Sequence, residues 1–467
     1  MAKDKTEYRC SECGWTSPKW VGQCRECQAW GTLEESGAQH VTNVPTAITP
    51  RRAAQPIGSV DSGRAQYRPT GVGELDRVLG GGIVPGAVIL LAGEPGIGKS
   101  TLLLDVAARA AQGASTRGGA PTPTASPSGD PVLYITGEES SSQVKSRADR
   151  ISALSDRLFL ADDNDLGSIL GHIDATHPSL LVVDSIQTVL SADVDGGAGG
   201  VAQVRAVTSA LIRVAKERDL PVIVVGHVTK DGGIAGPRVL EHLVDVVCQF
   251  EGERHGRLRL LRAVKNRYGP TDEVGCFELM DTGIRGLPDP SGLFLSQTSE
   301  DVPGSCVTVS LEGRRPMPTE IQALVTEAGA ANGRRTTSGV DHSRVAMILA
   351  VLQARLGVDF TSKDVYVSTV GGAKTSEPAV DLAMAVALMS SVLERAPRAK
   401  LVAMGEIGLT GEVRSSTGIQ RRLQEAARLG FTTAIVPAQG SEEIRPVKGI
   451  DILTVSDLNT TMRVALP

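Results

Sequence analysis

The chain has 467 residues, a formal net charge of -5 at pH 7 and a hydrophobic content of 41%. This length suggests about three domains with a large buried core, and the composition is ordinary for a soluble globular protein. No apolar run reaches the ~18 residues of a membrane span and there is no signal-peptide core, so we expect a cytoplasmic protein. The negative net charge gives no general affinity for nucleic acid, so such contacts must come from local basic residues.

Four of the seven cysteines lie within the first 27 residues, as two Cys-x-x-Cys pairs separated by ten residues. Four thiolates at this spacing favour a closed tetrahedral zinc site, and two pairs this close together argue against a redox dithiol. Zinc binding supplies folding energy that so small a module lacks. We therefore predict a zinc ribbon over residues 1–35, with four ligands: Cys10, Cys13, Cys24 and Cys27.

All three tryptophans lie in this ribbon: Trp15, Trp20 and Trp30. We expect them to pack its miniature core, and the alternative is that they offer a stacking face to a base or a partner. Residues 36–66 have little periodicity and several prolines and glycines, which predicts a linker. The remaining cysteines lie in apolar stretches and are expected in the core: Cys248, Cys276 and Cys306.

A phosphate-binding loop is the strongest motif of the chain. It matches G-x-x-x-x-G-K-[ST], after a predicted buried strand over 87–92 and before a predicted helix over 101–112. Its glycines let backbone N–H groups point at an anion, and the helix N-terminus adds partial positive charge. Lys99 would reach the β- and γ-phosphates of ATP, and the Ser100 hydroxyl would ligate Mg²⁺. The whole loop is expected to contact the nucleotide: Gly93, Glu94, Pro95, Gly96, Ile97, Gly98, Lys99, Ser100 and Thr101.

Residues 70–82 carry a "TG…LD…LGGG" pattern that resembles the segment before the phosphate loop in RecA-like ATPases. A carboxylate then follows the predicted strand over 131–136, where it can polarise the attacking water. Glu138 is the predicted water-activating base, with Glu139 as the alternative. The apolar run that ends at Asp184 is a Walker B pattern, and Asp184 would hold Mg²⁺ through water.

His227 ends the predicted strand over 221–226, at a position where RecA-like proteins place a polar γ-phosphate sensor. A structural hydrogen bond is the equally weighted alternative for this side chain. In the RecA-like fold, the glycine-rich segments near 185–205 and 229–238 face a ring or filament axis and grip single-stranded DNA. The cations available for phosphates there are Lys230, Arg238 and Arg205. Neither segment contains an aromatic residue, so base stacking is not expected in them.

Residues 113–130 are a low-complexity insertion, which predicts a disordered surface loop to which we assign no function. Residues 244–264 predict a closing hairpin that leads into Lys265-Asn266-Arg267-Tyr268-Gly269. Cations at positions i and i+2 of a strand project to one side. Lys265 and Arg267 are therefore suited to reach the γ-phosphate of a neighbouring subunit, as an arginine finger does.

The Lys-Asn-Arg-Tyr-Gly motif, downstream of a four-cysteine ribbon and a RecA-like core, resembles the signature of the bacterial RadA (Sms) family. The last third of the chain is similar to Lon proteases over residues 371–393 and 405–413. Where Lon has its nucleophilic serine this chain has Ala379, and Gln420 replaces the Lon lysine. Alanine has no nucleophile and glutamine cannot act as a base, so we expect no peptidase activity. The roles left for this domain are ring assembly and further DNA contact. Four cations are candidates for the DNA contact: Lys374, Arg414, Arg421 and Arg422.

The predicted fold class is α/β, with a RecA-like P-loop core over 67–285, the N-terminal four-cysteine ribbon and a Lon-like α/β domain over 286–467. The RadA resemblance implies a hexameric, helicase-like DNA motor that uses ATP, Mg²⁺ and Zn²⁺. It also implies branch migration on single-stranded and branched DNA during homologous recombination and repair, with the RecA recombinase as partner. A nucleotide-gated scaffold that binds DNA or RecA without moving is the alternative, and an ATP-dependent protease is disfavoured.

Overall fold

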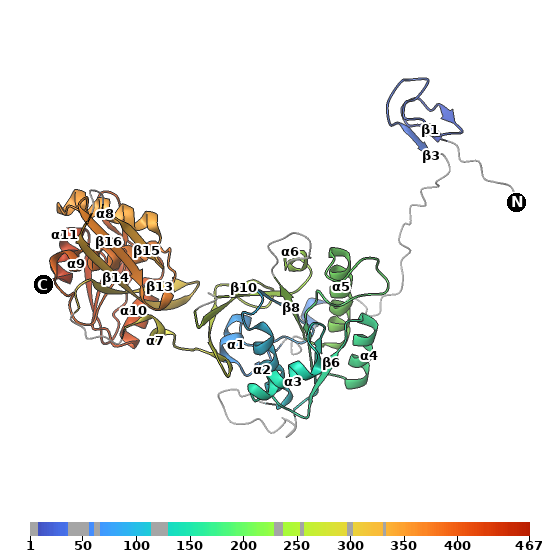
Figure 1. The fold of residues 1–467 in the computed structure, drawn as a ribbon, viewed down its shortest axis with the longest axis horizontal. Coiled ribbons are helices and arrows are strands. Elements are labelled where there is room, and N and C mark those ends of the chain that lie inside the picture. Colours follow the sequence, from blue (N-terminus) through green and yellow to red (C-terminus); the bar gives the residue numbers. More distant parts are fainter. Residues whose placement is uncertain are drawn as a thin grey trace. The chain divides into compact units, whose positions relative to one another are not determined.

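The computed structural model describes residues 8–35, 56–59, 66–113, 129–227, 237–252, 256–296, 302–329 and 333–467. The chain divides into two compact units, Met1–Asp61 and Ser62–Pro467 (Figure 1). None of the described helices is long and apolar enough to cross a membrane. Most of the predicted low-complexity loop lies outside the described residues. The proposed domain boundaries at 35, 66 and 285 stay predictions.

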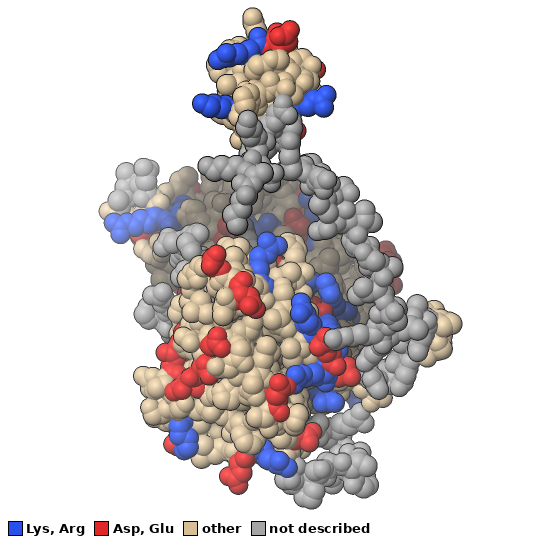
Figure 2. Space-filling model, turned by 90° about the vertical axis from the view of Figure 1, so that its right-hand side faces the viewer, with Lys and Arg blue, Asp and Glu red and all other residues tan. Residues whose placement is uncertain are grey.

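The first unit contains a three-stranded antiparallel sheet of order β2-β1-β3. Its strands are β1 (Tyr8–Cys10), β2 (Thr16–Ser17) and β3 (Leu33–Glu35). Cys10, Cys24 and Leu33 are buried, and Trp15 packs partly against them. Trp20 and Trp30 are 59% and 75% exposed, so the prediction that all three tryptophans pack the core is wrong for these two. Figure 2 shows this small unit with a mostly uncharged surface and with both basic and acidic side chains at its edges.

A nine-stranded sheet forms the first part of the larger unit, in the order β12-β11-β10-β9-β4-β8-β7-β5-β6. Six neighbouring strands are parallel: β4 (Val88–Gly93), β5 (Val132–Thr136), β6 (Leu158–Asp162), β7 (Leu180–Asp184), β8 (Val222–His227) and β9 (Val246–Glu251). Three antiparallel strands extend this sheet: β10 (Leu258–Asn266), β11 (Val274–Met280) and β12 (Gly283–Gly286).

Helices cover both faces of the parallel strands, which explains why these strands read as continuous apolar runs. One hydrophobic cluster joins the sheet to α1 (Gly73–Leu79), α2 (Lys99–Ala111) and α3 (Ser141–Arg150). The opposite face packs against α4 (Leu166–Thr176), α5 (Val201–Arg218) and α6 (Pro237–Glu241). The carboxyl ends of β4, β5, β7 and β8 consequently meet at one edge of a sheet that is buried on both sides.

A seven-stranded sheet forms the C-terminal part, in the order β15-β16-β14-β13-β17-β20-β21 (Figure 1). Its strands are β13 (Ser305–Glu312), β14 (Arg315–Glu327), β15 (Arg335–Ser338), β16 (Lys363–Thr369), β17 (Leu401–Ala403), β20 (Thr433–Pro437) and β21 (Asp451–Val455). A separate hairpin consists of β18 (Glu406–Ile407) and β19 (Val413–Arg414).

One large cluster in this part contains residues of α8 (His342–Leu356), α9 (Asp381–Leu393) and α11 (Leu458–Ala465). A second cluster contains α10 (Ile419–Arg428), and α7 (Ser291–Phe294) is a short helix near the start of this part. Cys248, Cys276 and Cys306 are buried in strands, which confirms that they are core residues.

A buried ion pair joins β14 of the second sheet to α1, which packs against the first sheet. Arg315, at the start of β14, pairs with Glu74 of α1, and both side chains are about 5% exposed or less. The Arg315 guanidinium also donates to the carbonyl oxygens of Val274 (3.0 Å), Leu287 (3.0 Å) and Pro288 (2.7 Å). Glu74 accepts a further bond from the backbone N–H of Cys276 at 2.8 Å. The pair is therefore well supplied with hydrogen bonds, as a buried ion pair must be.

Replacing Arg315 by alanine is expected to destabilise the larger unit by about 3–5 kcal/mol, because the buried Glu74 carboxylate loses its closest cation and keeps the more distant Arg77, whose Nε lies 3.6 Å away. The midpoint of urea-induced unfolding, followed by circular dichroism, measures the loss. Arg314→Ala is the matched control, since Arg314 forms a half-exposed ion pair with Asp272 at 3.3 Å. Such surface pairs contribute about 0–1 kcal/mol. Equal shifts for the two variants would contradict a special role for the buried pair.

Candidate active site and metal centre

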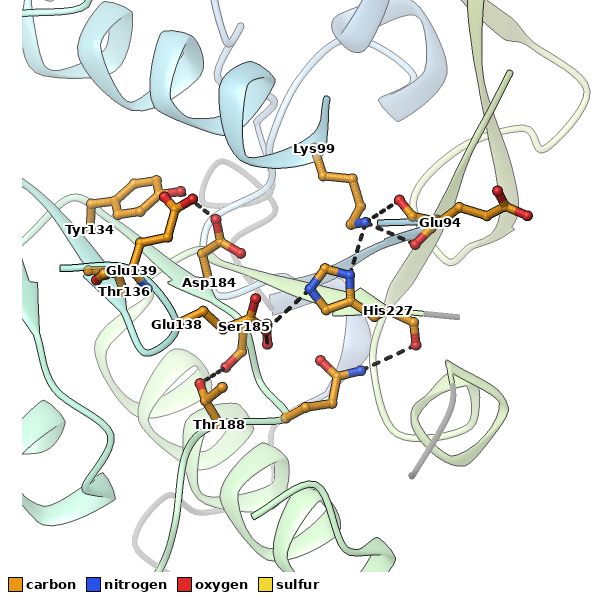
Figure 3. Close-up of polar contacts among 12 residues, drawn as sticks. Glu94, Lys99, Tyr134, Thr136, Glu138, Glu139, Asp184, Ser185, Thr188 and His227 are labelled. Atoms are coloured by element: carbon orange, nitrogen blue, oxygen red, sulfur yellow. Dashed lines mark hydrogen bonds and ion pairs between the residues drawn. The ribbon is translucent and has the colours of Figure 1, made fainter. Parts of the chain in front are cut away.

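The phosphate loop connects β4 to α2, as its sequence predicts. Gly96 and Gly98 have φ values of +78° and +109°, which a side chain rarely tolerates, so glycine is required at these two turns. Lys99 begins α2 and is only 3% exposed. Its ammonium group donates to the carbonyl oxygens of Gly93 (2.8 Å) and Glu94 (2.9 Å) (Figure 3). The loop therefore curls around the end of its own lysine, where a phosphate group would sit.

Strand register brings the other predicted residues to the same edge. Gly93 at the end of β4 lies opposite His227 at the end of β8, and Thr136 of β5 lies opposite Asp184 of β7. Ligands of open parallel sheets bind outside the carboxyl ends of the strands. The four strand ends thus define one polar site on an otherwise apolar sheet.

A chain of polar contacts runs through this site (Figure 3). The Lys99 ammonium lies 3.2 Å from Nδ1 of His227, and Nε2 of His227 lies 3.3 Å from Oε1 of Glu138. The Ser185 hydroxyl donates to the same Glu138 oxygen at 2.6 Å. The His227–Glu138 approach does not have hydrogen-bond geometry, so Nε2 of His227 is buried without a hydrogen-bond partner among the described residues. Oε1 of Gln187, whose amide nitrogen donates to the His227 carbonyl, is likewise buried with no partner in the described part of the chain.

These two orphaned atoms indicate a site that is short of polar partners. Buried donors and acceptors without partners are rare and costly in folded proteins. A phosphate group with its hydration water offers both an acceptor and donors. The arrangement therefore fits a nucleotide at the loop.

The two adjacent glutamates have different surroundings. Glu139 forms an ion pair with Arg147 of α3, and the Thr136 hydroxyl fixes its backbone by donating to the Glu139 carbonyl oxygen and accepting from the Glu139 N–H. Glu138 instead faces Lys99 and His227, with its side chain 45% exposed. Geometry therefore favours Glu138 over Glu139 as the group that meets a water molecule at the γ-phosphate.

A hydrogen bond that the sequence did not predict holds Asp184. The Tyr134 hydroxyl donates to Oδ2 of Asp184 at 2.7 Å, and Asp184 is 9% exposed. Burial, together with the neighbouring Asp184 charge, raises the pKa of Tyr134 well above its usual value, so it stays a donor. One carboxylate oxygen is thereby fixed, and Asp184 and Ser100 are the residues that would hold Mg²⁺. When bound, Mg²⁺ supplies positive charge to the phosphate oxygens.

The surroundings of Lys99 predict that ATP binding depends on pH. Burial lowers the pKa of its ammonium to about 8, against the opposing charges of Asp184 and Glu138. Bound phosphate favours the protonated form, so above pH 8 binding must take up a proton. We expect the affinity for a non-hydrolysable ATP analogue to fall by up to about tenfold per pH unit above 8.

Calorimetry in two buffers of different ionisation enthalpy measures this proton uptake directly. The Lys99→Arg variant is the control, because arginine stays charged throughout this range. If the wild type takes up no proton when it binds the analogue at pH 9, the lowered pKa of Lys99 is contradicted.

Lys265 and Arg267 do not line the phosphate loop of their own chain. Arg267 lies 3.2 Å from the carboxylate of Asp245, which also accepts bonds from Lys216 (2.8 Å) and from the backbone N–H of Val88 (3.0 Å). Val88 is the first residue of β4, whereas Gly93 is the last. A strand of this length spans about 17 Å. The two cations therefore lie toward the opposite edge of the sheet from the loop.

The Lys265 ammonium donates to the carbonyl oxygens of Glu241 (2.7 Å) and Val244 (2.8 Å), at the end of α6 and just after it. Burial raises the pKa of Asp245, but the Lys216 hydrogen bond and the Val88 amide outweigh it, and the pKa lies below its usual value. Asp245 therefore stays ionised and anchors this region. Sequence reasoning missed Asp245 because the residues it joins are far apart in the chain.

The predicted DNA contacts are only partly described. Arg205 is exposed on α5. Lys230 lies outside the described residues, and so does the side chain of Arg238, whose backbone belongs to α6.

The prediction that Arg422 contacts DNA is wrong. This side chain is fully buried, pairs with Glu377, and donates to the carbonyl oxygens of Val309 (2.6 Å) and Thr417 (3.0 Å). The replaced Lon positions are both ordinary structural residues. Ala379 is fully buried, and the Gln420 amide exchanges hydrogen bonds of 3.2 and 2.8 Å with the backbone of Arg445.

The four N-terminal cysteines form one cluster, with all sulfur atoms within 4.8 Å of one another. Two of the distances are 3.7 Å (Cys10–Cys27) and 3.6 Å (Cys13–Cys24). A tetrahedral site with Zn–S bonds of about 2.3 Å has S–S edges of about 3.8 Å. The cluster therefore has the size and ligand set of a structural zinc site.

Three family models match the chain: a rubredoxin metal-binding domain over residues 8–35, an AAA domain over 62–233 and the ChlI subunit of Mg-chelatase over 337–440. The DNA repair protein RadA of Mycolicibacterium smegmatis is 51% identical over 445 residues, which cover 93% of this chain and 92% of the relative. RadA of Mycobacterium tuberculosis is 49% identical (94% and 89% covered). RadA of Bacillus subtilis is 42% identical over the full length of both chains.

These matches confirm the predicted fold class, with its P-loop core, N-terminal four-cysteine ribbon and C-terminal Lon-like domain. They also confirm the predicted cofactors, since the AAA domain uses ATP with Mg²⁺ and the cysteine ribbon binds Zn²⁺. Relatives this similar over nearly the whole chain leave no large segment unmatched. The chain belongs to the RadA family of DNA repair proteins.

Proposed function

We propose that this chain is an ATP-driven motor on single-stranded DNA, working as a ring of six subunits in the cytoplasm. Its task is branch migration of recombination intermediates during DNA repair, together with the RecA recombinase. The names of the relatives, which are DNA repair proteins, support the task. The residues of the ATPase site support ATP as the energy source. The position of Lys265 and Arg267 supports the assembly of subunits into a ring.

The location of Lys265 and Arg267 carries the proposal. Arg267 is paired with Asp245, which is bonded to the start of β4, whereas the phosphate loop follows the end of β4. No side-chain rotation closes a gap of about 17 Å, because an extended arginine reaches less than half of that. The cations can therefore complete a nucleotide site only if that site belongs to another subunit. With its side chain 55% exposed, Arg267 is accessible to such a neighbour.

The chain's own residues then divide the work of hydrolysis. Residues 93–101 bind the phosphates, and Lys99 leaves its carbonyl partners to contact the β- and γ-phosphates. Glu138 orients the attacking water and accepts its proton, while Ser185 fixes the carboxylate. His227 senses the γ-phosphate, and Lys265 and Arg267 from the next subunit stabilise charge on the transferring group.

ATP hydrolysis and strand displacement, measured side by side on single-stranded, duplex and forked DNA, test this proposal. We expect single-stranded and forked DNA to stimulate hydrolysis and the forked substrate to be unwound. The particle mass under ATP should equal six chains. Stimulated hydrolysis without unwinding would instead favour the scaffold that binds DNA without moving. A monomer with full DNA-stimulated activity would refute the ring.

A further inference from the structure

The zinc ribbon presents two large aromatic side chains to solvent. Trp20 and Trp30 are 59% and 75% exposed, although burial of a large aromatic side chain is strongly favourable. The core of the unit is complete without them, since Cys10, Cys24 and Leu33 pack with other partly buried residues: Tyr8, Trp15 and Val21. Folding therefore does not explain why these two positions carry indole rings.

The two rings are held next to each other by the second cysteine knuckle. A β-carbon placed on Gly22 would lie 3.8 Å from a ring atom of Trp20 and 3.8 Å from a ring atom of Trp30. The backbone beneath them is fixed by a hydrogen bond of 2.8 Å from Gly31 to Gly22, and by a β-bridge between Gln23 and Trp30. The rings thus belong to one rigid surface, which we call the tryptophan face: Trp20, Gly22 and Trp30.

Two exposed cations lie beside this face in the sequence. Lys19 directly precedes Trp20, and Arg25 lies between Trp20 and Trp30. Both side chains are exposed, and neither side chain forms an ion pair or a hydrogen bond with another residue of 8–35. Proteins that bind single strands without sequence preference combine such cations with aromatic rings on which bases stack. Duplex DNA offers no equivalent contact, because its bases are already stacked on one another.

We propose that Trp20 and Trp30 stack unpaired bases of single-stranded DNA while Lys19 and Arg25 neutralise its phosphates. This inference rests on the proposed function, since it assumes that the chain works on such DNA. It supplies what the motor core lacks, because the glycine-rich segments 185–205 and 229–238 contain no aromatic residue. A partner protein would also cover exposed indoles, but the exposed cations Lys19 and Arg25 favour a polyanion.

Intrinsic fluorescence tests the proposal on the full chain. All three tryptophans lie between residues 15 and 30, so the tryptophan emission of the whole protein reports on the ribbon alone. We expect a thymidine oligonucleotide, added without ATP, to quench this emission in a saturable way. An abasic oligonucleotide of equal length carries the same phosphates without bases and should leave the emission nearly unchanged.

Substitutions then separate stacking from folding. Trp20→Ala and Trp30→Ala should each weaken binding of the thymidine oligonucleotide by about tenfold, the size of one base–aromatic contact. Trp20→Phe and Trp30→Phe should recover part of the loss, since phenylalanine also stacks. Trp15→Phe is the matched control and should bind like the wild type. Zinc content measured on every variant identifies any that has lost the ribbon fold.

Two results would overturn the proposal. The first is equal quenching by the abasic oligonucleotide, which would mean that bases are not read. The second is wild-type affinity in Trp20→Ala and Trp30→Ala with zinc retained, which would mean that the tryptophan face does not bind DNA. If thymidine oligonucleotides neither bind the chain nor stimulate hydrolysis, the proposed function fails instead. DNA-stimulated hydrolysis with unchanged emission leaves the motor intact and removes only the stacking face.

Discussion

Replacement of Arg267 by alanine is expected to lower the kcat of DNA-stimulated ATP hydrolysis by about 10³-fold or more, with ATP affinity close to that of the wild type. The magnitude is that of an arginine finger, which stabilises charge only as the phosphoryl group transfers. Affinity is retained because the Arg267 side chain lies far from the loop that binds the nucleotide. Steady-state kinetics and binding of a non-hydrolysable analogue measure the two quantities separately.

Lys216→Ala is the matched control for this variant. Lys216 and Arg267 share the carboxylate of Asp245, so both substitutions remove one of its partners. If Arg267 acts only by supporting Asp245, the two variants should lose similar amounts of activity. We expect Lys216→Ala to stay within a few-fold of the wild type, since a part-exposed ion pair contributes about 1 kcal/mol or less.

Mixing two inactive chains decides whether Arg267 acts in a neighbouring site. Rings assembled from Lys99→Ala and Arg267→Ala chains contain some sites with an intact loop from one chain and intact cations from the other. Those sites should regain hydrolysis on mixing, although each variant alone is inactive. Mixed rings that are demonstrated by mass and remain inactive would contradict a contribution in trans.

Glu138→Gln is expected to reduce kcat by about 10²- to 10⁴-fold, the range for loss of a general base. Glutamine preserves the size of the side chain and its bond from Ser185, but it cannot accept a proton. Binding of ATP should change little, because Glu138 does not contact the loop backbone in the structure. Single-turnover hydrolysis, started by adding Mg²⁺, isolates the chemical step.

The neighbouring Glu139→Gln substitution provides the comparison. Glu139 is paired with Arg147 of α3, so its loss affects a helix contact and leaves the polar chain from Lys99 to Glu138 in place. Its kcat should stay within a few-fold of the wild type. A larger loss in Glu139→Gln than in Glu138→Gln would reverse the assignment of the base.

Much of the ATPase site could be predicted because its parts are local in the sequence. The phosphate loop is one continuous segment, and Glu138, Asp184 and His227 each follow a recognisable apolar strand. Parallel strands place their carboxyl ends at one edge, so their convergence follows from the fold class. The sequence could not show which of the two glutamates faces the site. That depends on the position of Arg147 in the following helix, α3, which pairs with Glu139.

The features that the sequence did not predict depend on the register between neighbouring strands and on contacts between residues that are far apart in the chain. Tyr134 meets Asp184 only because β5 lies beside β7 in a particular register. Arg315 and Glu74 are 241 residues apart, and no local pattern connects them. The tryptophans were assigned to the core on the assumption that a small module buries its largest side chains. Trp20 and Trp30 break that rule, since the cysteine cluster and a few neighbours already fill the interior.

The last residues of β8 and α6 contact two different functional groups. His227, which ends β8, lies beside Lys99 in the chain's own nucleotide pocket, and the carbonyl oxygen of Glu241, which ends α6, accepts a bond from the Lys265 ammonium. If Lys265 serves the adjacent subunit, β8 and α6 each contact a residue of a different nucleotide site. A shift of β8 relative to α6 would then alter both sites together, so hydrolysis in neighbouring subunits would be coupled rather than independent.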